Sequence, residues 1–299
     1  MTAPRSTVLP EATPLSHQRA QLRTLLPHIL WATAFLILFI GPLKLLAIDW
    51  WTDPEAGHGL LLAPAALWLG WKKGIVTTRA AQPLLGTLVL VMGVVLRLAS
   101  ELAAERFTMR FAVLLAAAGL VVFFFGLRQL LAWWLPFVLL TLSIPLPELL
   151  RSALALPLQF KASALGAQLL EWRNVPVHLA GNIIQLPGHR LFVTEACSGL
   201  RSLTALLSLG VLMGGVWLKT PWLRLLLLAV TVPIAVLLNG VRVFLTGFLV
   251  FYVDPALGDG FMHMTEGWLL FLVSFGLVAG MAVLLRSWER WREASQQHA

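Results

Sequence analysis

The 299-residue chain has little charge, a single cysteine and a single tyrosine. Only 12% of its residues are charged, whereas soluble globular proteins average about 25%. A chain this poor in charge cannot cover a folded domain with polar side chains, so its length is not evidence for two soluble domains. Its mean hydropathy of +0.83 and its 59% of hydrophobic residues predict a protein whose solvent is lipid.

The lone thiol and the scattered charges exclude several classes of protein. One cysteine, Cys197, cannot form an intrachain disulfide. The net charge is +8, but the basic residues lie between apolar segments and form no single basic face, so we expect no binding of nucleic acid. The histidines lack a short metal-binding spacing such as HExxH, and we expect no metal and no other cofactor.

About eight apolar segments approach the roughly 20 helical residues that a bilayer span needs. We therefore expect an all-α integral membrane protein with a transmembrane domain over residues 26–286. The expected spans lie near residues 26–48, 58–71, 84–100, 109–127, 130–147, 199–218, 222–241 and 267–285. The first run lacks a small-residue cleavage site and is interpreted as a retained span. The apolar segment 243–253 is about half a span long and could be re-entrant or interfacial.

The distribution of charge predicts the orientation in the membrane. With the N-terminus inside, the inner segments carry 12 basic residues and only three acidic ones, as the positive-inside rule requires. Both termini are then cytoplasmic, with a disordered tail over 1–25 and a C-terminal tail over 287–299. The extracytoplasmic segments are 49–57, 101–108, 148–196 and 254–266. The opposite orientation would place most basic residues on the wrong side.

The longest outer segment, 148–196, is predicted to hold its own secondary structure. Residues 152–172 are apolar with a few charges and predict an amphipathic helix. Between Val175 and Val193, short β-branched runs flank Pro187 and Gly188, which predicts a small β-hairpin with its turn at these two residues. The hairpin directly precedes Cys197.

Three polar segments that are far apart in the sequence are predicted to meet at the outer face. They are residues 194–201 at the start of the sixth span, residues 239–242 at the end of the seventh, and His263 just before the eighth. This convergence follows from the charge distribution alone. It suggests a polar site at the membrane surface.

Cys197 is either a small buried hydrophobe, as a lone cysteine in a membrane protein usually is, or a nucleophile. It lies at the beginning of a predicted helix, whose dipole favours an anion, and Arg201 follows one turn later. Both features stabilise a thiolate. The neighbouring Glu195 and Ser198 are polar rather than packing residues, so the pattern favours the nucleophile.

Arg242 also has alternative interpretations. It could be an interfacial arginine or the ion-pair partner of an acid such as Glu195 or Glu266. An ionisable residue at a span end, with Asn239 three residues earlier, is nevertheless a functional hypothesis. Its guanidinium could hold a developing oxyanion or an acidic side chain of a substrate.

Three histidines are predicted on the outer side. His263 alone could be an interfacial residue, but with a cysteine and an arginine at the same depth it becomes the natural general acid and base. His58, between two glycines, is its main competitor for that role. His189 follows Pro187 and Gly188 and is interpreted as a turn residue.

The three segments resemble the core signature of the exosortase/archaeosortase family of integral membrane proteins. That signature is an ACSG-x-R stretch, an N-x-x-R stretch and a later histidine, found here in the same order and spacing at 196–201, 239–242 and His263. Residues 145–147 and 181–188 fit as well. Residues 51–59 resemble the family's outer-loop motif, with Gly57 where the family more often has serine. The resemblance covers roughly residues 45–285.

The resemblance implies a multi-pass enzyme of the bacterial cytoplasmic membrane that acts as an analogue of sortases. Such enzymes are thought to process exported proteins with a C-terminal sorting signal: a Pro-Glu-Pro-like motif, one transmembrane helix and a basic tail. They are linked to exopolysaccharide production, contact membrane lipids and use an unknown acceptor nucleophile. The implied catalytic residues are Cys197, Arg242 and His263, and the implied supporting residues are Arg201, Asn239, Glu195, Ser198 and His58.

Two alternatives from other functional classes remain. A transporter would carry ionisable residues along a path through mid-membrane, but Arg97 is the only residue that we interpret as lying inside a span rather than at the membrane surface, and it is near the end of its span. A non-catalytic subunit of polysaccharide assembly would need no activated thiol. Rapid labelling of Cys197 by an impermeant thiol reagent below pH 8 would distinguish an activated thiolate from a packed thiol.

Overall fold

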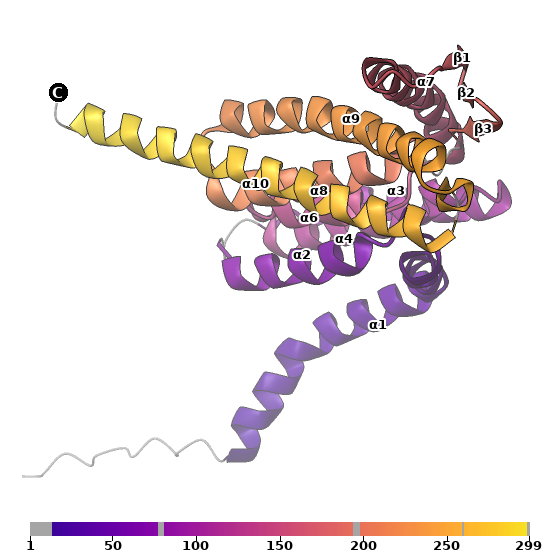
Figure 1. The fold of residues 1–299 in the computed structure, drawn as a ribbon. Helices are drawn as coiled ribbons and strands as arrows, with labels where there is room; N and C mark the ends of the chain where they lie inside the picture. Colours follow the sequence, from indigo (N-terminus) through magenta and orange to yellow (C-terminus); the bar gives the residue numbers. More distant parts are fainter. Residues whose placement is uncertain (1–13, 77–80, 194–197, 259, 298–299) are drawn as a thin grey trace, which may run out of the picture. The chain divides into compact units, whose positions relative to one another are not determined.

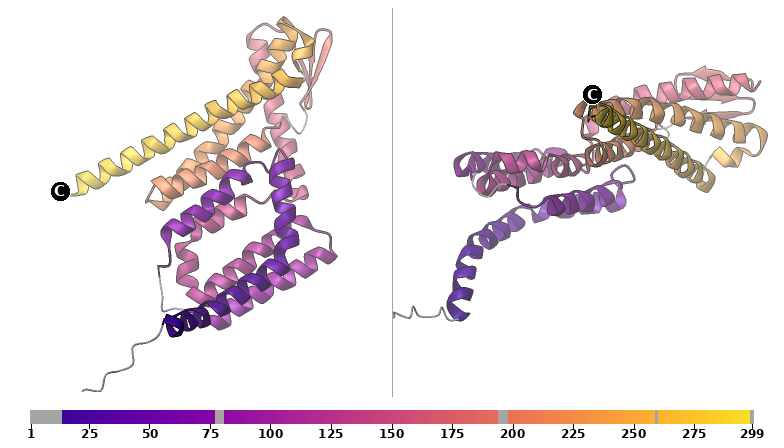
Figure 2. Two further views of the ribbon diagram at one scale, coloured as in Figure 1. Left: turned by 90° about the horizontal axis from the view of Figure 1, so that it is seen from below. Right: turned by 90° about the vertical axis from the view of Figure 1, so that its left-hand side faces the viewer.

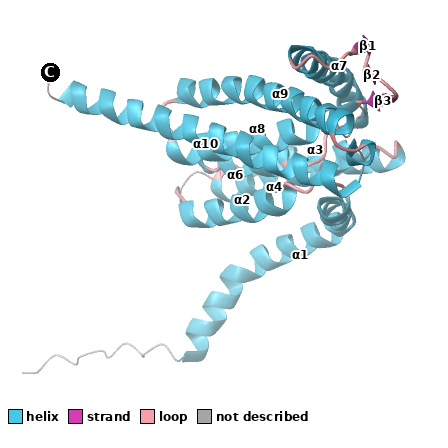
Figure 3. Ribbon diagram, in the orientation of Figure 1, coloured by secondary structure: helices cyan, strands magenta, loops and turns pink. Residues whose placement is uncertain are grey.

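The computed structural model describes residues 14–76, 81–193, 198–258 and 260–297. Helices make up most of these residues, with three short strands (Figure 3). The chain divides into two units, residues 1–45 and 46–299, and helix α1 (Pro14–Thr52) begins in the first and ends in the second. Residues 14–25 are therefore helical, which differs from the disordered tail expected there. Proline suits the first turn of a helix, and neither proline nor glycine follows until Pro27.

The second unit contains the remaining helices and the strands (Figure 1). They are, in chain order, α2 (Gly59–Lys73), α3 (Pro83–Leu102), α4 (Arg106–Phe125), α5 (Leu127–Ala132), α6 (Trp134–Leu142), α7 (Glu148–Trp172), β1 (His178–Ala180), β2 (Ile183–Leu186), β3 (His189–Phe192), α8 (Leu200–Trp217), α9 (Pro221–Tyr252) and α10 (Gly260–Gln297).

Six helical stretches in the described ranges are long and apolar enough to cross a membrane. They are Ile29–Thr52, Pro83–Leu102, Arg106–Phe125, Leu200–Trp217, Pro221–Tyr252 and Gly267–Gln297. Most of their side chains face outward rather than into the protein, as expected where lipid is the solvent. The chain is thus an all-α, multi-pass membrane protein.

Of the other two expected spans, 58–71 corresponds to the short helix α2, and 130–147 is shorter than predicted. Helix α2 has 15 residues and a length of about 22 Å, against the roughly 30 Å of a hydrocarbon core. It ends at Gly74, whose φ is +64°. The second stretch is interrupted at Trp133 and divided into α5 and α6. Pro145 and Pro147 then prevent α6 from continuing.

These short helices nevertheless connect the same two ends of the unit. The side chains of Gln129 and Trp133 each donate a hydrogen bond of 3.1 Å to the carbonyl of Gly74, where α2 ends. The ring of His58, where α2 begins, bonds the carbonyl of Leu142, where α6 ends. Helices α2 and α6 therefore run antiparallel, and buried leucines and alanines pack between them.

Helix α7 and the strands form a separate structured element beside one end of α9, far from the C-terminal end of α10 (Figure 2). The antiparallel sheet has the order β1-β2-β3. The predicted hairpin turn is confirmed, because Leu186 pairs with His189 and only Pro187 and Gly188 lie between them. Gly188 has a φ of +78°, which glycine adopts without strain. His189 itself is the first residue of β3.

Helix α9 is longer than the predicted seventh span. It continues for 32 residues, or about 48 Å, to Tyr252. Asn239 and Arg242 therefore lie inside the helix rather than at its end, and residues 243–252 continue α9 instead of turning back as a re-entrant piece. The reason is packing against α7: a Cβ on Gly166 of α7 would lie only 2.5 Å from Val243. Such close contact keeps the extension helical.

Two hydrophobic clusters fix α9 between its neighbours. One joins its C-terminal part to α7 and β2 through buried residues that include Leu170, Ile184 and Val250. The other joins its N-terminal part to α8 and α10 through Leu206, Leu223 and other side chains. Helix α9 is thus the element that connects α7, α8 and α10.

Candidate functional site

The start of α8 has the geometry of an anion-binding helix terminus. Gly199 is the N-cap residue, with a φ of +79° in the left-handed region. The hydroxyl of Ser198 accepts a hydrogen bond of 3.2 Å from the backbone nitrogen of Leu200, and both residues are buried. The predicted nucleophile Cys197 and its neighbour Glu195 lie outside the described residues. The structure therefore describes the helix start that follows the thiol, where the first N–H groups have no partner within the helix.

Asn239 of α9 packs directly on this helix start. A Cβ built on Gly199 would lie 2.5 Å from Cγ and 2.7 Å from Nδ2 of Asn239. Only glycine leaves room for that side chain, and Asn239 is 7% exposed. The contact brings the first and second predicted polar segments together, two residues from Cys197.

Arg242, one turn further along α9, packs on the beginning of α10. A Cβ built on Gly267 would lie 3.2 Å from Nη2 and 3.3 Å from Cζ of Arg242. His263 precedes Gly267 by four residues in the same helix, so the two positions lie on one face of α10. The side chain of His263 lies outside the described residues. The backbone nevertheless brings the second and third predicted segments together.

Arg201, which the sequence predicts to support the thiolate, is exposed on the first turn of α8. Its carbonyl accepts a hydrogen bond of 3.0 Å from the hydroxyl of Thr204. The exposed position leaves the guanidinium in water. Its electrostatic effect on the Cys197 thiolate would therefore be screened by solvent and salt.

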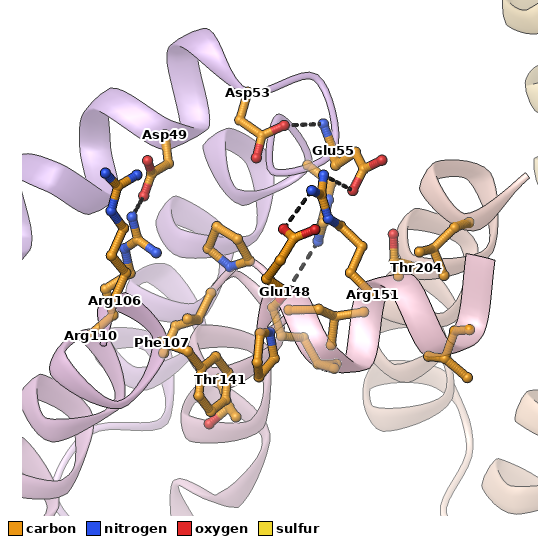
Figure 4. Close-up of a pocket in the computed structure, with 18 of the residues that line it drawn as sticks. Asp49, Asp53, Glu55, Arg106, Phe107, Arg110, Thr141, Glu148, Arg151 and Thr204 are labelled. Atoms are coloured by element: carbon orange, nitrogen blue, oxygen red, sulfur yellow. Dashed lines mark hydrogen bonds and ion pairs between the residues drawn. The ribbon is translucent and has the colours of Figure 1, made fainter. Parts of the chain in front are cut away.

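A cavity of about 790 Å³ lies on another side of the start of α8 (Figure 4). Its walls come from the residues around His58, the start of α4, the end of α6, the beginning of α7 and the first two turns of α8. The predicted outer segments 49–57 and 101–108 and the start of 148–196 thus gather at one end of the unit. Nothing in the sequence pattern indicates this cavity.

Ion pairs cross the cavity wall. Arg110, which is 5% exposed, pairs with Asp49, and the guanidinium of Arg151 bonds both Glu148 and Glu55, the latter at 3.4 Å (Figure 4). The Arg110–Asp49 pair joins α4 to α1, and the Arg151–Glu55 pair joins α7 to the loop before α2. The sequence holds a signal for the pairs of Arg151 alone: it lies in a segment assigned to the outer side, where an arginine runs against the positive-inside bias and calls for local acidic partners.

His58 braces the cavity wall. Its Nε2 lies 3.1 Å from the carbonyl oxygen of Leu142, which can only accept, so Nε2 carries the proton. Burial lowers the pKa of His58, and hydrogen bonding to the backbone of Leu142 and Glu55 acts in the opposite direction. Nearby, Nε1 of Trp50 donates a bond of 2.7 Å to the carbonyl of Ser143. The ring of His58 is thus engaged in holding the loop.

The comparison with family models decides the identity of the chain. The family described as transmembrane exosortase matches residues 50–280. The chain belongs to this family. No curated protein and no solved structure matches it. Membership supports a general role in protein sorting by a membrane transpeptidase, and the resemblance that the sequence motifs suggested is confirmed.

The matched range of this exosortase includes every residue predicted for the site, from His58 to His263. Of these, the structure connects Ser198, Asn239 and Arg242 with the backbone around His263, whereas His58 lines the cavity. No group of three His, Cys, Asp or Glu side chains suited to a metal ion occurs among the described residues.

Proposed function

We propose that this exosortase is a cysteine-type protease and transpeptidase that cleaves the C-terminal sorting signals of exported proteins. The observation that carries the proposal is the double contact of α9: Asn239 against Gly199 and Arg242 against Gly267. One helix thereby links the segment of Cys197 to the segment of His263. A Pro-Glu-Pro-like motif, a transmembrane helix and a basic tail make up the proposed signal.

In this proposal Cys197 attacks the scissile carbonyl and forms a thioester. The start of α8 favours the thiolate through its dipole, and Arg201 adds a positive charge one turn away. Ser198 supports the helix start, since its hydroxyl accepts from the Leu200 backbone. Glu195 is proposed as a further supporting residue.

Arg242 holds the oxyanion and Asn239 orients the loop of the nucleophile. A planar guanidinium offers several donors in a fixed arrangement, which suits a developing negative oxygen. His263 protonates the leaving amine, whose transmembrane tail remains in the bilayer. Because the helix of the substrate fixes its scissile bond at the membrane surface, tethering replaces a bimolecular encounter by a positioned one.

The reaction is assigned to the extracytoplasmic face of a bacterial inner membrane, with both termini in the cytoplasm. Support comes from the bias of basic residues toward the opposite segments. The link to exopolysaccharide-producing bacteria is part of the same proposal and rests on the family resemblance.

Processing of a tagged substrate, followed by immunoblotting, tests the assignment of residues. Cys197→Ala should abolish cleavage while the protein stays inserted and abundant. Arg242→Ala and His263→Ala should each reduce it strongly. Arg190→Ala and His189→Ala are matched controls, because both residues are exposed on β3 and should leave cleavage unchanged. Normal cleavage by the Cys197→Ala protein would exclude the nucleophile.

Trapping tests the covalent step. A hydroxylamine-sensitive thioester between Cys197 and the substrate should be detected by mass spectrometry in a strain starved of acceptor. The Arg242→Lys protein should fail to process substrate although it keeps the positive charge, because an ammonium group does not offer the planar set of N–H donors of a guanidinium. Full processing in both the Arg242→Ala and His263→Ala proteins would contradict the proposed triad.

A further inference from the structure

Strand β3 forms an open edge of the three-stranded sheet. It pairs with β2 on one side, and β2 is its only close neighbour among the described elements, whereas β1, the other edge strand, also lies beside α7. His189, Arg190 and Phe192 of β3 are exposed. An edge of this kind can add a further strand, because its outward backbone groups have no partner within the sheet.

The hydrogen bonds at the end of β3 show which backbone groups face outward. Val193 donates from its backbone nitrogen to the carbonyl of Asn182 at 3.0 Å, and its own carbonyl accepts from Nδ2 of Asn182 at 3.1 Å. The backbone of Val193 therefore points toward the β2 side. Because this direction alternates along a strand, Arg190 and Phe192 point their N–H and C=O groups away from β2. Neither residue bonds another element in the described part of the chain.

This open edge leads directly to the proposed nucleophile. Cys197 is the fourth residue after Val193, and four residues span at most about 14 Å even when fully extended. Gly199, two residues later, begins α8 in contact with Asn239. A peptide that lies along β3 is therefore within a short distance of the thiol.

We propose that β3 binds the sorting motif of the exported protein by strand addition: the segment before the transmembrane helix of the substrate joins the sheet as a fourth strand, parallel to β3. This inference rests on the proposed function. The parallel direction brings the substrate chain to Cys197, and its helix then enters the bilayer. Main-chain hydrogen bonds to Arg190 and Phe192 hold the segment extended. The side chains of β3 are not needed for these bonds, so substitutions such as Arg190→Ala leave the edge intact.

A Pro-Glu-Pro-like segment has the backbone chemistry for pairing on one side only. In an extended strand, neighbouring residues direct their N–H and C=O groups to opposite sides. The glutamate therefore presents both groups to one side, and the two prolines, which have no N–H, face the other side. The segment can pair with β3 through its glutamate, while its far side offers no N–H to a further strand.

Photo-cross-linking tests the position of the substrate. In membranes, p-benzoylphenylalanine replaces Phe192 in the Cys197→Ala protein, and the probe is a tagged exported protein with a Pro-Glu-Pro-like motif, a transmembrane helix and a basic tail. We expect an adduct with this substrate. The matched control carries the same group at Ala180, which is exposed in the same cross-strand row at the opposite edge of the sheet.

Three outcomes of the cross-linking would overturn the proposal. They are equal adducts at the two positions, no adduct with the substrate, and an adduct with a second copy of this chain in place of the substrate. Because cross-linking needs no cleavage, it reports on binding even if Cys197 is not the nucleophile. The inference and the proposed function can therefore fail separately.

Proline substitution tests the backbone bonds. Phe192→Pro removes an outward N–H of β3 and keeps the pairing with β2, because proline is tolerated where the N–H points away from the sheet. Cleavage of the tagged substrate should fall about tenfold, as expected for a lost hydrogen bond and a misplaced strand. Phe192→Ala, which keeps the N–H, should lose much less.

Leu179→Pro is the matched control at the other edge. Leu179 pairs with Ile184, whose backbone faces β3, so the N–H of Leu179 also points away from β2. This variant should cleave as the wild type does. Unchanged cleavage by the Phe192→Pro protein, or equal losses in the two proline variants, would overturn the proposal.

Discussion

At the scale of single residues, Gly199 and Asn239 form the closest packing contact described in the site. Gly199→Ala adds a methyl group that would lie 2.5 Å from Cγ of Asn239. The asparagine or the helix start must move, and a displacement near 1 Å can cost about a hundredfold in rate. We expect processing of a tagged substrate to fall on that order, while the amount of inserted protein stays normal on immunoblots.

Gly188→Ala is the matched control for this substitution. Gly188 has nearly the same positive φ, +78° against +79°, but no atom lies within 4 Å of its missing Cβ. Both variants carry the same backbone strain, and only Gly199→Ala meets Asn239. Equal losses of processing in the two proteins would mean that strain, and not the contact, causes the effect.

His58 gives the loop before α2 a pH dependence. Burial lowers its pKa from 6.5, so the folded protein binds this proton more weakly than the unfolded chain does. The stabilisation is fully present above pH 6.5 and is lost as the pH falls from 6.5 through the lower, folded-state pKa. Thermal unfolding in detergent should show a midpoint that falls over this range, and His58→Gln should reduce the slope.

If His58→Gln leaves the slope as steep as in the wild type, another group carries the proton, and His58 does not brace the loop in its neutral form.

The sequence predicts which polar segments meet where their charge places them at one membrane depth. It does not predict individual side-chain contacts that depend on how the helices pack. The polar segments around Ser198, Asn239 and His263 could be expected to meet, because the charge distribution put them at one depth. The contact of Asn239 with Gly199 could not, since it depends on the relative rotation of α8 and α9. The pairing of Arg110 with Asp49 was missed for the same reason.

At the scale of elements, Glu289 of α10 caps the start of α9. Its carboxylate accepts from the backbone nitrogens of Lys219 at 3.1 Å and Thr220 at 2.7 Å, and from the Thr220 hydroxyl. The residue is 6% exposed. Hydrogen bonds to a charged group contribute about 1.5–3 kcal/mol, so Glu289→Ala should lower the unfolding midpoint clearly.

Glu293→Ala provides the element-scale control. Glu293 lies one turn later in α10 and pairs with the exposed ammonium of Lys219 at 3.0 Å. Exposed pairs contribute about 0–1 kcal/mol, so this variant should unfold close to the wild type. Similar midpoints for the two variants, measured by the same detergent unfolding assay, would contradict a capping role for Glu289.

Element types were easier to predict than element lengths. The hairpin turn at Pro187 and Gly188 follows from local residue preferences, and the structure has it there. The end of α9 does not follow from local preferences. The predicted span ended at residue 241, whereas the missing side chain of Gly240 makes room for Leu165 of α7, 2.7 Å from a built Cβ. Tertiary packing therefore extends the helix.

At the scale of the whole second unit, the short helices α2 and α6 decide the number of crossings. Length and apolar composition give six spans among the described residues, whereas the sequence predicts about eight. The hydrogen bonds at Gly74 and at Leu142 join opposite ends of the α2–α6 pair. Since α2 and the combined α5–α6 stretch both run between those ends, we infer that both cross a locally thinner bilayer.

Reporter fusions test this inference and the orientation together. Alkaline phosphatase is active only outside the cytoplasm, so fusions after Thr52 and Arg173 should be active, and fusions after Gly74 and at the C-terminus should be inactive.

The fusion after Gly74 is decisive for α2. If α2 crosses, Lys72 and Lys73 lie inside, as the positive-inside bias requires. Activity at Gly74 with inactivity at the C-terminus would leave six spans. Activity at the C-terminus would reverse the orientation of α10 and place His263 in the cytoplasm, which the proposed reaction with exported proteins does not permit.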